Sequence, residues 1–251
     1  MKRFFDIVAS AVALALVWPA IVIALAAVWL YDRHSPIYWA SRVGKNSRIF
    51  KMAKIRSMRV GADLAGGTST SGDDKRITPV GHYIRRFKLD EFLQLWNVLR
   101  GDMHMVGPRP NTPKDVELYT PLEMKLVTVK PGITDVSSIV FSDEGAILFG
   151  SINPDELYNR IIRPWKSRLG ILYIENQSLG LDFQIIWLTI TALFSKQNAL
   201  LGVNGILLRL QATPELITIC SRVDVPVEAL PPGMELGANI QNFEKSANAC
   251  A

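Results

Sequence analysis

The longest apolar stretch of the chain lies near its N-terminus, from residue 7 to residue 31. These 25 residues carry no charged side chain. A straight helix of that length measures about 37 Å, which exceeds the roughly 30 Å of a bilayer's hydrocarbon core. The pattern therefore predicts a helix that enters a membrane. Pro19 stands close to its middle, and a kink is expected there because proline removes one intrahelical hydrogen bond.

Three interpretations of this stretch compete. A signal peptide would explain Met1-Lys2-Arg3 before an apolar run, but the run is longer than a usual h-region and Asp6 directly precedes it. A single membrane span would put Lys2 and Arg3 across the membrane from the basic segment that follows, against the positive-inside rule. A re-entrant hairpin, bent at Pro19, would return the chain to the face from which it entered. The residues alone do not separate the last two.

A second pattern, over residues 84–100, predicts one amphipathic helix. Its apolar side chains recur near a 3.6-residue period, at Ile84, Phe87, Leu89, Phe92, Leu95, Trp96 and Leu99. An adjacent acid pair, Asp90 and Glu91, is set into it, and a loop containing Gly107, Pro108 and Pro110 follows. For the pair alone, a solvated face with salt bridges is the simpler interpretation, because burying carboxylates is costly unless they are paired or bound to metal.

Between these patterns, residues 37–58 alternate apolar and basic side chains around Gly44-Lys45-Asn46, which predicts a short β-hairpin. Lys54 and Arg56 are two residues apart, so we expect them on one face of the second strand. They are either a solvated basic face or a clamp for phosphate. Residues 61–76 are rich in Gly, Ser, Thr and Asp and are predicted to form a loop.

The second half of the chain predicts further helices. Asn153 is suited to cap a helix whose first turn contains Pro154. Residues 181–194 are strongly apolar but shorter than a membrane span, so they fit either a buried helix or an interfacial one. A second acid pair, Asp143 and Glu144, falls in a predicted loop, where a solvated turn is the simpler interpretation. Residues 205–251 form a weaker tail, in which Pro231-Pro-Gly and the final Glu-Lys-Ser-Ala-Asn-Ala-Cys-Ala are expected to be loosely ordered.

Charge is distributed unevenly along the 251 residues, whose net charge is +5. Residues 33–100 hold 14 Lys/Arg and 5 Asp/Glu, whereas residues 101–251 hold 12 and 16. A basic half suits an anionic membrane face, a nucleotide or nucleic acid. The lack of a recognisable nucleic-acid motif and the apolar stretch argue against nucleic acid. Two cysteines and three histidines without ligand spacing argue against a disulfide framework or a zinc site.

The basic surroundings change the interpretation of Asp90 and Glu91. A carboxylate can act as nucleophile, general base or metal ligand. Nearby cations would keep it ionised and would also neutralise phosphate oxygens. A hard divalent ion such as Mg2+ could join a carboxylate to a diphosphate. The combination points to phosphoryl transfer, and the apolar stretch suggests that one substrate is a lipid.

Several ordered motifs then suggest a family. They are Lys2-Arg3-Phe-Phe-Asp6, Phe50 to Met58, Arg76 to Gly81, Leu89 to Met103, Val106-Gly-Pro-Arg109-Pro110 and Lys130 to Thr134. Each is weak alone, but their shared order is hard to produce by chance. Over roughly residues 2–195 the chain resembles the bacterial sugar transferases, the monotopic polyprenyl-phosphate phosphoglycosyl transferases.

The resemblance implies a re-entrant N-terminal helix with its break at Pro19, entering and leaving by the cytoplasmic face of the bacterial inner membrane. It implies transfer of a phosphosugar from a UDP-sugar to polyprenyl (undecaprenyl) phosphate, with release of UMP and a requirement for Mg2+. This reaction is the first membrane step in building a polysaccharide, an O-antigen or a glycoprotein glycan. The implied partners are these two substrates and membrane lipid, with no nucleic acid; family members can also be homodimers.

The resemblance also assigns roles to residues. Asp90 would carry the covalent phosphosugar, and Glu91 would assist with proton transfer or metal binding. The basic site would comprise Lys54, Arg56 and Arg109, with Arg85 as a further phosphate contact.

The expected fold is mainly α (α+β), with three parts. Residues 1–33 form the re-entrant membrane helix, a helix-break-helix hairpin. Residues 34–200 form a small cytoplasmic catalytic domain with amphipathic interfacial helices and a short β-hairpin. Residues 201–251 form a C-terminal extension that could serve dimerisation.

The chain also departs from the family pattern. Trp18 stands where the family usually has Ser, Leu93 replaces a frequent Pro, and Asp135 replaces a common Gly. Without that proline the helix over residues 84–100 should continue unbroken past Asp90. Residues 141–145 resemble the branch of small members, which puts Asp143 and Glu144 near the nucleotide sugar as an alternative to a solvated turn. Neither the residues nor the resemblance names the sugar.

Overall fold

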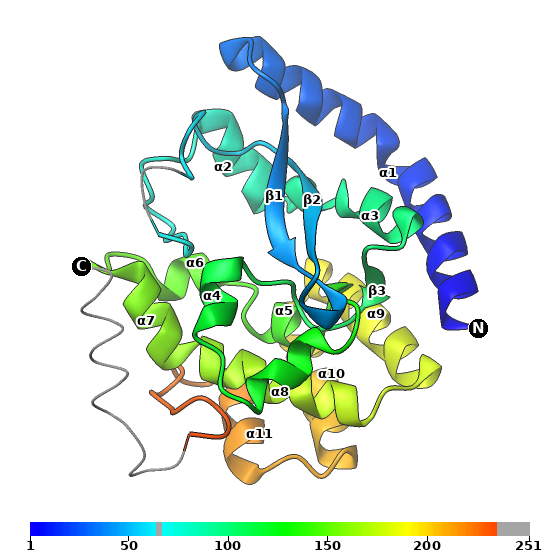
Figure 1. The fold of residues 1–251 in the computed structure, drawn as a ribbon, viewed down its shortest axis with the longest axis vertical. Helices are drawn as coiled ribbons and strands as arrows, with labels where there is room; N and C mark the ends of the chain where they lie inside the picture. Colours follow the sequence, from blue (N-terminus) through cyan, green and yellow to red (C-terminus); the bar gives the residue numbers. More distant parts are fainter. Residues whose placement is uncertain (64–66, 235–251) are drawn as a thin grey trace.

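The computed structural model describes residues 1–63 and 67–234, which are mostly helical with two small two-stranded sheets (Figure 1). The helices are α1 Lys2–Asp32, α2 Pro79–Arg86, α3 Gln94–Arg100, α4 Pro113–Glu117, α5 Val136–Val140, α6 Glu144–Ile147, α7 Pro154–Ile161, α8 Arg163–Glu175, α9 Leu179–Phe194, α10 Lys196–Arg209 and α11 Pro214–Ser221. The strands are β1 Ile37–Val43, β2 Ile49–Ile55, β3 His104–Val106 and β4 Gly132–Thr134, and the short 3-10 helices are Lys45–Ser47, Leu89–Glu91 and Glu123–Val127. The predicted mainly α class with a short β-hairpin is confirmed.

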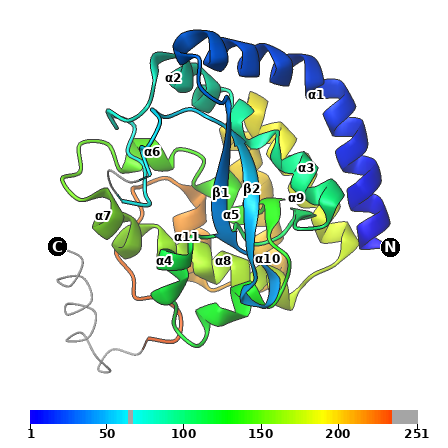
Figure 2. The ribbon, with the colours of Figure 1, turned by 45° about the horizontal axis from the view of Figure 1, so that its top comes forward.

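The apolar N-terminal stretch forms α1, one continuous helix of 31 residues with Pro19 inside it. Within the described ranges, it is the helix long and apolar enough to cross a membrane by length and composition. Figure 2 shows that its two halves run in different directions. A proline inside a helix produces a kink because it removes one hydrogen bond and crowds the preceding turn. The predicted helix-break-helix hairpin is therefore not confirmed, since the chain stays helical through Pro19.

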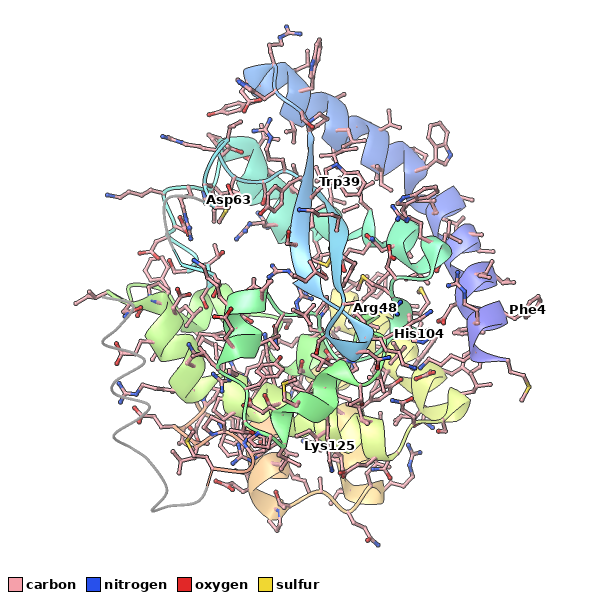
Figure 3. All side chains as sticks on the ribbon, in the orientation of Figure 1. Phe4, Trp39, Arg48, Asp63, His104 and Lys125 are labelled. Atoms are coloured by element: carbon pink, nitrogen blue, oxygen red, sulfur yellow. The ribbon has the colours of Figure 1, made fainter. Side chains whose placement is uncertain are left out.

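Both ends of α1 are fixed to the rest of the protein. Near its start, the ammonium of Lys2 lies 2.8 Å from the buried carboxylate of Asp182 on α9. The buried Asp6 accepts a hydrogen bond of 3.0 Å from a backbone N–H of β3, and His104 of that strand also contacts it beside the helix (Figure 3). At the other end, Asp32 accepts two hydrogen bonds of 2.6 Å from Arg56. The two ends of α1 thus belong to one folded unit.

The predicted β-hairpin is present. β1 and β2 pair antiparallel, with Ile37 opposite Ile55 and Val43 opposite Ile49. The turn contains Asn46 in a left-handed conformation with φ 56°, which asparagine tolerates better than most residues. This hairpin packs on α3, where the side-chain oxygen of Asn97 accepts a hydrogen bond of 2.9 Å from the Ala53 N–H.

The short parallel pair of β3 and β4 fixes the loop that follows β3. His104 lies opposite Gly132 and Val106 opposite Thr134. A Cβ added to Gly132 would come 2.1 Å from the Gly107 nitrogen, so the two backbones approach as closely as only glycine allows. The Gly-Pro-Arg-Pro and Lys-Pro-Gly motifs therefore meet, and their contact positions Arg109.

The prediction of one helix over residues 84–100 is wrong. α2 ends at Arg86, Lys88 adopts a left-handed conformation with φ 52°, and Asp90 and Glu91 lie in a 3-10 turn before α3 begins. The physical reason is tertiary packing, since the apolar side chains of this turn pack against the second half of α1, at Leu89, Phe92 and Leu93. In a straight helix Ile84 and Leu93 would lie on opposite faces, yet both pack in the cluster that contains α1, so packing overrides local periodicity.

The largest hydrophobic core lies among α5 and α8 to α11. Its members include residues beyond the predicted catalytic boundary at 200, among them Val203, Ile206, Leu216 and Cys220. The predicted weaker tail thus contributes to the core as far as α11. Residues 235–251 and residues 64–66 of the predicted loop lie outside the described residues, and a role in dimerisation stays a prediction.

Candidate active site

A cavity of about 490 Å³ opens between the hairpin, α2 and the turn that carries the acid pair. The segment of residues 138–146 and the start of α8 close its other side. Its charged lining comes from Arg42, Lys54, Arg85, Arg86, Lys88, Arg109, Lys166, Asp90, Glu91, Asp115, Asp143 and Glu144. Cations outnumber acids in this lining, as expected for a site that receives an anion.

The acid pair occupies the floor of the cavity, and its two carboxylates have different partners. Asp90 is mostly buried, and its carboxylate lies 3.7 Å from the Lys54 ammonium. That separation is an ion pair but exceeds the length of a hydrogen bond. Glu91 instead accepts a direct charge-assisted hydrogen bond from Arg109. Within the part of the chain that the structure describes, Asp90 is therefore the carboxylate with oxygens free to meet a ligand, while Arg109 holds Glu91 in place.

The charges in this cluster shift one another's pKa values. Burial opposes ionisation of Glu91, but Arg109 and Lys54 outweigh it and lower the pKa of Glu91 to about 2. The same contact raises the pKa of Arg109 above its usual value. Burial acts more strongly on Lys54 than its neighbouring carboxylates do, so the pKa of Lys54 is lowered. At neutral pH, Glu91 and Arg109 form a permanent ion pair.

The structure brings together most of the predicted phosphate-binding residues, with one exception. Lys54, Arg85 and Arg109 all line the cavity, and Arg85 donates a hydrogen bond of 3.0 Å to the Ser57 hydroxyl. Arg56 does not line it. Arg56 directly follows strand β2, which ends at Ile55, and its guanidinium donates hydrogen bonds to both carboxylate oxygens of Asp32. The side chain of Arg56 pairs with α1 instead.

The second acid pair lies in the cavity wall. Asp143 immediately precedes α6, and its carboxylate lies 2.8 Å from the Lys196 ammonium and 3.0 Å from the Arg222 guanidinium. Glu144 pairs with Lys166 at the start of α8. Both acids thus line the cavity and are not simply a solvated turn. Two of these cations come from α10 and from the residue that follows α11.

Several cavity residues were missed from the sequence. The register of the hairpin could have identified Arg42. Tyr38 lies opposite Lys54, and Arg42 is four residues after Tyr38 on the same strand, so the side chains of all three lie on one face. Tyr158 and Lys166 come from α7 and α8, and no local pattern marked them. Burial raises the pKa of Tyr158 well above its usual value, which keeps its hydroxyl available as a neutral hydrogen-bond donor.

The predicted loop over residues 61–76 has fixed contacts at the edge of the cavity. The Ser69 N–H donates a hydrogen bond of 2.6 Å to the carboxylate of Asp155 on α7. The Gly72 N–H donates one of 2.8 Å to the Gly145 carbonyl. The described part of the predicted loop thus joins the acid-pair segment at residues 143–145 and forms a wall of the site.

The described residues contain no group of three or more His, Cys, Asp or Glu side chains that could hold a metal ion on their own. Asp90 and Glu91 remain as an adjacent carboxylate pair beside cations. Mg2+ commonly takes only one or two protein carboxylates and completes its coordination with water and substrate phosphate. The free oxygens of Asp90 fit that mode of binding.

Comparison with known proteins agrees with these features. A family model described as bacterial sugar transferase matches residues 1–196. The chain is 36% identical over 205 residues to an undecaprenyl-phosphate glucose phosphotransferase of Komagataeibacter xylinus, covering 79% of this chain and 36% of that protein. It is 35% identical over 200 residues to the galactosyl transferase CpsE of Streptococcus agalactiae, covering 75% of this chain and 41% of that protein.

A further relative is matched over most of its own length. The exopolysaccharide production protein ExoY of Rhizobium meliloti is 31% identical over 206 residues, which is 76% of this chain and 84% of that protein. By contrast, the chain spans only about two fifths of the length of the first two relatives. The family match nevertheless includes α1, the hairpin, the acid pair and the Gly-Pro-Arg-Pro loop. The chain belongs to the bacterial sugar transferase family.

Proposed function

We propose that the protein transfers a phosphosugar from a UDP-sugar to polyprenyl phosphate and releases UMP. The observation that carries this proposal is the position of Asp90. Its carboxylate opens into a cation-lined cavity, while the turn that holds it packs against the apolar helix α1. A nucleotide sugar needs the cations and a polyprenyl chain needs the membrane, and this turn lies where the two meet. The names of the relatives support the same class of reaction.

The first step is attack by Asp90. A carboxylate oxygen of Asp90 forms a bond to the phosphorus that bears the sugar, and the bond from that phosphorus to the bridging oxygen breaks. The electron pair stays on the bridging oxygen, which leaves with UMP. Lys54, 3.7 Å from Asp90, lies close enough to neutralise the oxygens of the attacked phosphate.

The second step regenerates the enzyme. An oxygen of polyprenyl phosphate attacks the same phosphorus, and the acyl phosphate bond to Asp90 breaks with its electron pair returning to the carboxylate. The product is a polyprenyl diphosphate sugar. Because the turn at residues 89–91 packs on α1, a lipid phosphate at the membrane surface would reach the phosphosugar without leaving the bilayer.

Glu91 and Arg109 act as a fixed unit in this scheme. Their ion pair holds Arg109 at the cavity, where its remaining N–H groups can bind phosphate oxygens bidentately. Mg2+, held by Asp90 and Glu91, would supply neutralisation of the diphosphate charge. The cations of this chain already favour the ionised form of Glu91, whose pKa is lowered to about 2.

The contacts of α1 support a re-entrant rather than a spanning helix. Lys2 and Asp32, at its opposite ends, both bond to the catalytic part of the chain. A spanning helix would place those ends on opposite sides of the bilayer. With both ends on one side, the protein sits on the cytoplasmic face of the bacterial inner membrane, where UDP-sugars are available.

Helix α9 supports the same placement. It buries Leu181 and Ile185 but exposes large apolar side chains, at Phe183, Trp187, Ile190, Leu193 and Phe194. The rings of Phe5 on α1 and Phe183 on α9 have centroids 4.6 Å apart, so the two exposed surfaces are continuous. Phe4 points away from the rest of the protein (Figure 3). This continuous apolar surface would lie in the membrane interface.

The test uses the full chain in detergent or nanodiscs with polyprenyl phosphate, Mg2+ and a panel of UDP-sugars. At least one UDP-sugar should yield UMP. The Asp90→Asn variant should lose at least about 1,000-fold in rate, as expected for removal of a nucleophile. The matched control is Asp63→Asn, which changes an exposed acid outside the cavity. Substantial turnover by Asp90→Asn would reject Asp90 as the nucleophile.

A covalent intermediate gives a second readout. With UDP-sugar and no lipid acceptor, wild-type protein should release about one UMP per chain and gain the mass of one phosphosugar on the peptide containing Asp90. If no UDP-sugar produces UMP or this adduct, a membrane-anchored scaffold that only binds anionic partners becomes the better description.

A protease site placed before Met1 tests the membrane arrangement. In sealed inside-out vesicles, a re-entrant helix exposes this site to added protease on the same side as the catalytic domain. Cleavage only after detergent treatment would support a spanning helix instead.

A further inference from the structure

Arg42 on β1 is a cation of the cavity without an anionic partner in the described part of the chain. Its Nε is buried and has no hydrogen-bond partner among the described residues, and its side chain lines the cavity. Lys54 pairs with Asp90 and Arg109 pairs with Glu91. The register of the hairpin puts Arg42 on the same face as Lys54.

The cost of this arrangement points to a ligand. Burying a charge is unfavourable unless an opposite charge or strong hydrogen bonds compensate. The electrostatic neighbours of Arg42 include the cation Arg109 as well as Asp115, but the Asp115 carboxylate accepts hydrogen bonds from Thr68 and Thr112. Burial accordingly lowers the pKa of Arg42. An anion that enters the cavity would relieve this cost.

The position of Arg42 along the hairpin indicates which phosphate it meets. Lys54 is at the end of the hairpin that contacts the Asp90 turn. Arg42 is nearer the opposite end, where the neighbouring Val43 N–H donates a hydrogen bond of 3.0 Å to the Asn111 carbonyl. A diphosphate with one phosphate beside Asp90 and Lys54 would therefore extend its other phosphate toward Arg42.

We propose that Arg42 binds the phosphate that leaves with UMP. When the Asp90 oxygen bonds to the sugar-bearing phosphorus, the bridging P–O bond breaks and its electron pair remains on the UMP phosphate. That phosphate gains negative charge as the bond breaks, so hydrogen bonds donated by Arg42 become stronger in the transition state than in the bound substrate. This inference rests on the proposed transfer and adds a leaving-group ligand to it.

Binding of UMP tests the contact without turnover. Calorimetric titration should show that Arg42→Met weakens UMP binding at least about 10-fold, while binding of uridine, which lacks the phosphate, is unchanged. Arg42→Lys should restore part of the affinity. The matched control is Arg48→Met, because Arg48 belongs to the same hairpin but is exposed and outside the cavity (Figure 3). Equal UMP affinity for wild type and Arg42→Met would overturn the proposal.

Steady-state kinetics of the Arg42→Met variant provide a second test of the proposal. Arg42→Met should lower kcat more than it changes KM for the UDP-sugar, by roughly 100-fold in kcat, because the contact strengthens as the leaving group forms. A change confined to KM would assign Arg42 to ground-state binding and overturn the leaving-group role.

A measurement on the wild-type chain covers the case in which the variants do not fold. Phenylglyoxal modifies accessible guanidinium groups, and mass spectrometry locates the modified arginines. UMP, but not uridine, should protect Arg42 and leave Arg48 reactive. Protection without UMP release from any UDP-sugar would keep the phosphate site and reject the transfer. UMP release from a UDP-sugar without protection of Arg42 would keep the transfer and reject the phosphate site at Arg42.

Discussion

Two of the buried acid–base clusters in this protein differ in how completely their carboxylates are hydrogen-bonded. In the C-terminal core, Glu123 and Arg163 are 0% and 2% exposed. Glu123 accepts hydrogen bonds from Arg163 at 2.9 and 3.2 Å, from the Ser167 hydroxyl at 2.7 Å and from the Thr120 N–H at 3.0 Å. At the cavity, the Asp90 carboxylate has only the 3.7 Å ion pair with Lys54 among residues 1–63 and 67–234.

The difference separates a structural ion pair from the pair that we propose takes part in the reaction. Desolvation is offset at Glu123 because its oxygens are occupied by donors within the fold. The carboxylate of Asp90 keeps its capacity to accept new bonds, and cations around it attract the ligand that would use that capacity. The same residue types therefore hold the core together in one region and leave a site open in the other.

Glu123→Gln tests the structural side of this comparison and has the largest expected effect on stability. It leaves the buried Arg163 without its anion, which costs about 3–5 kcal/mol of unfolding free energy. Chemical denaturation followed by circular dichroism measures the loss. The double variant Glu123→Leu with Arg163→Met removes both charges and should recover much of it. A single variant as stable as wild type would contradict the structural assignment.

Arg109→Met tests the reactive side. Removing the guanidinium that holds Glu91 and faces the cavity should lower kcat/KM about 100-fold, or roughly 2.7 kcal/mol of transition-state stabilisation. Its effect on unfolding should be smaller than that of Glu123→Gln, because water in the cavity can solvate Glu91. Arg100→Met is the control, since Arg100 is exposed and lies outside the cavity. If Arg109→Met lost more unfolding free energy than transition-state stabilisation, Arg109 would be a structural residue and the comparison would be wrong.

Local sequence patterns were sufficient where neighbouring residues determine the structure. The turn at Gly44-Lys45-Asn46 and the alternation around it produce the observed hairpin. Asn153 caps α7 by accepting a hydrogen bond of 3.2 Å from the Glu156 N–H, and Pro154 occupies the first turn as expected. The cation-rich surroundings of Asp90 and Glu91 also followed from composition and family motifs.

Long-range packing decided what the sequence could not show. The apolar period over residues 84–100 contains no sign that Lys88 interrupts it, because the interruption is what lets Ile84 and Leu93 both pack in the cluster with the distant α1. Arg56 has the right residue type and spacing for a phosphate clamp, yet Asp32 binds it. Arg222 donates a hydrogen bond to Asp143 of the cavity lining from a position 79 residues later, a separation that no motif spans.

Val28→Ala tests whether the packing of α1 supports the turn that carries Asp90. Val28 is 3% exposed and packs in the cluster that includes Leu89, whereas Val22 is 50% exposed. Removing two methyl groups at Val28 should cost about 1–2 kcal/mol, and kcat should also fall because the turn carrying Asp90 loses support. The same substitution at Val22 is the control and should change unfolding by less than about 0.5 kcal/mol. Equal effects at both positions would show that α1 serves only as an anchor.

The smallest effect is expected at Asp143, whose carboxylate is intermediate between the fully hydrogen-bonded Glu123 and the largely unbonded Asp90. Two cations contact one of its oxygens, Lys196 at 2.8 Å and Arg222 at 3.0 Å. Loss of either leaves the other in place, so Lys196→Met or Arg222→Met should raise KM for the UDP-sugar only about three- to ten-fold, close to 1 kcal/mol. Arg222→Lys should preserve most of the wild-type value.

The double variant distinguishes positioning from simple loss of packing. If Lys196 and Arg222 act together by holding Asp143 against the cavity, removing both should raise KM by more than the product of the single effects, because each single variant retains one cation. Arg209→Met, an exposed change on α10, should leave KM unchanged. A purely structural role would instead lower the unfolding midpoint of both single variants without changing KM or the relative rates with different UDP-sugars. Coupling in KM would make the helices beyond the family-matched segment part of the site, since they fix the acid that faces the substrate.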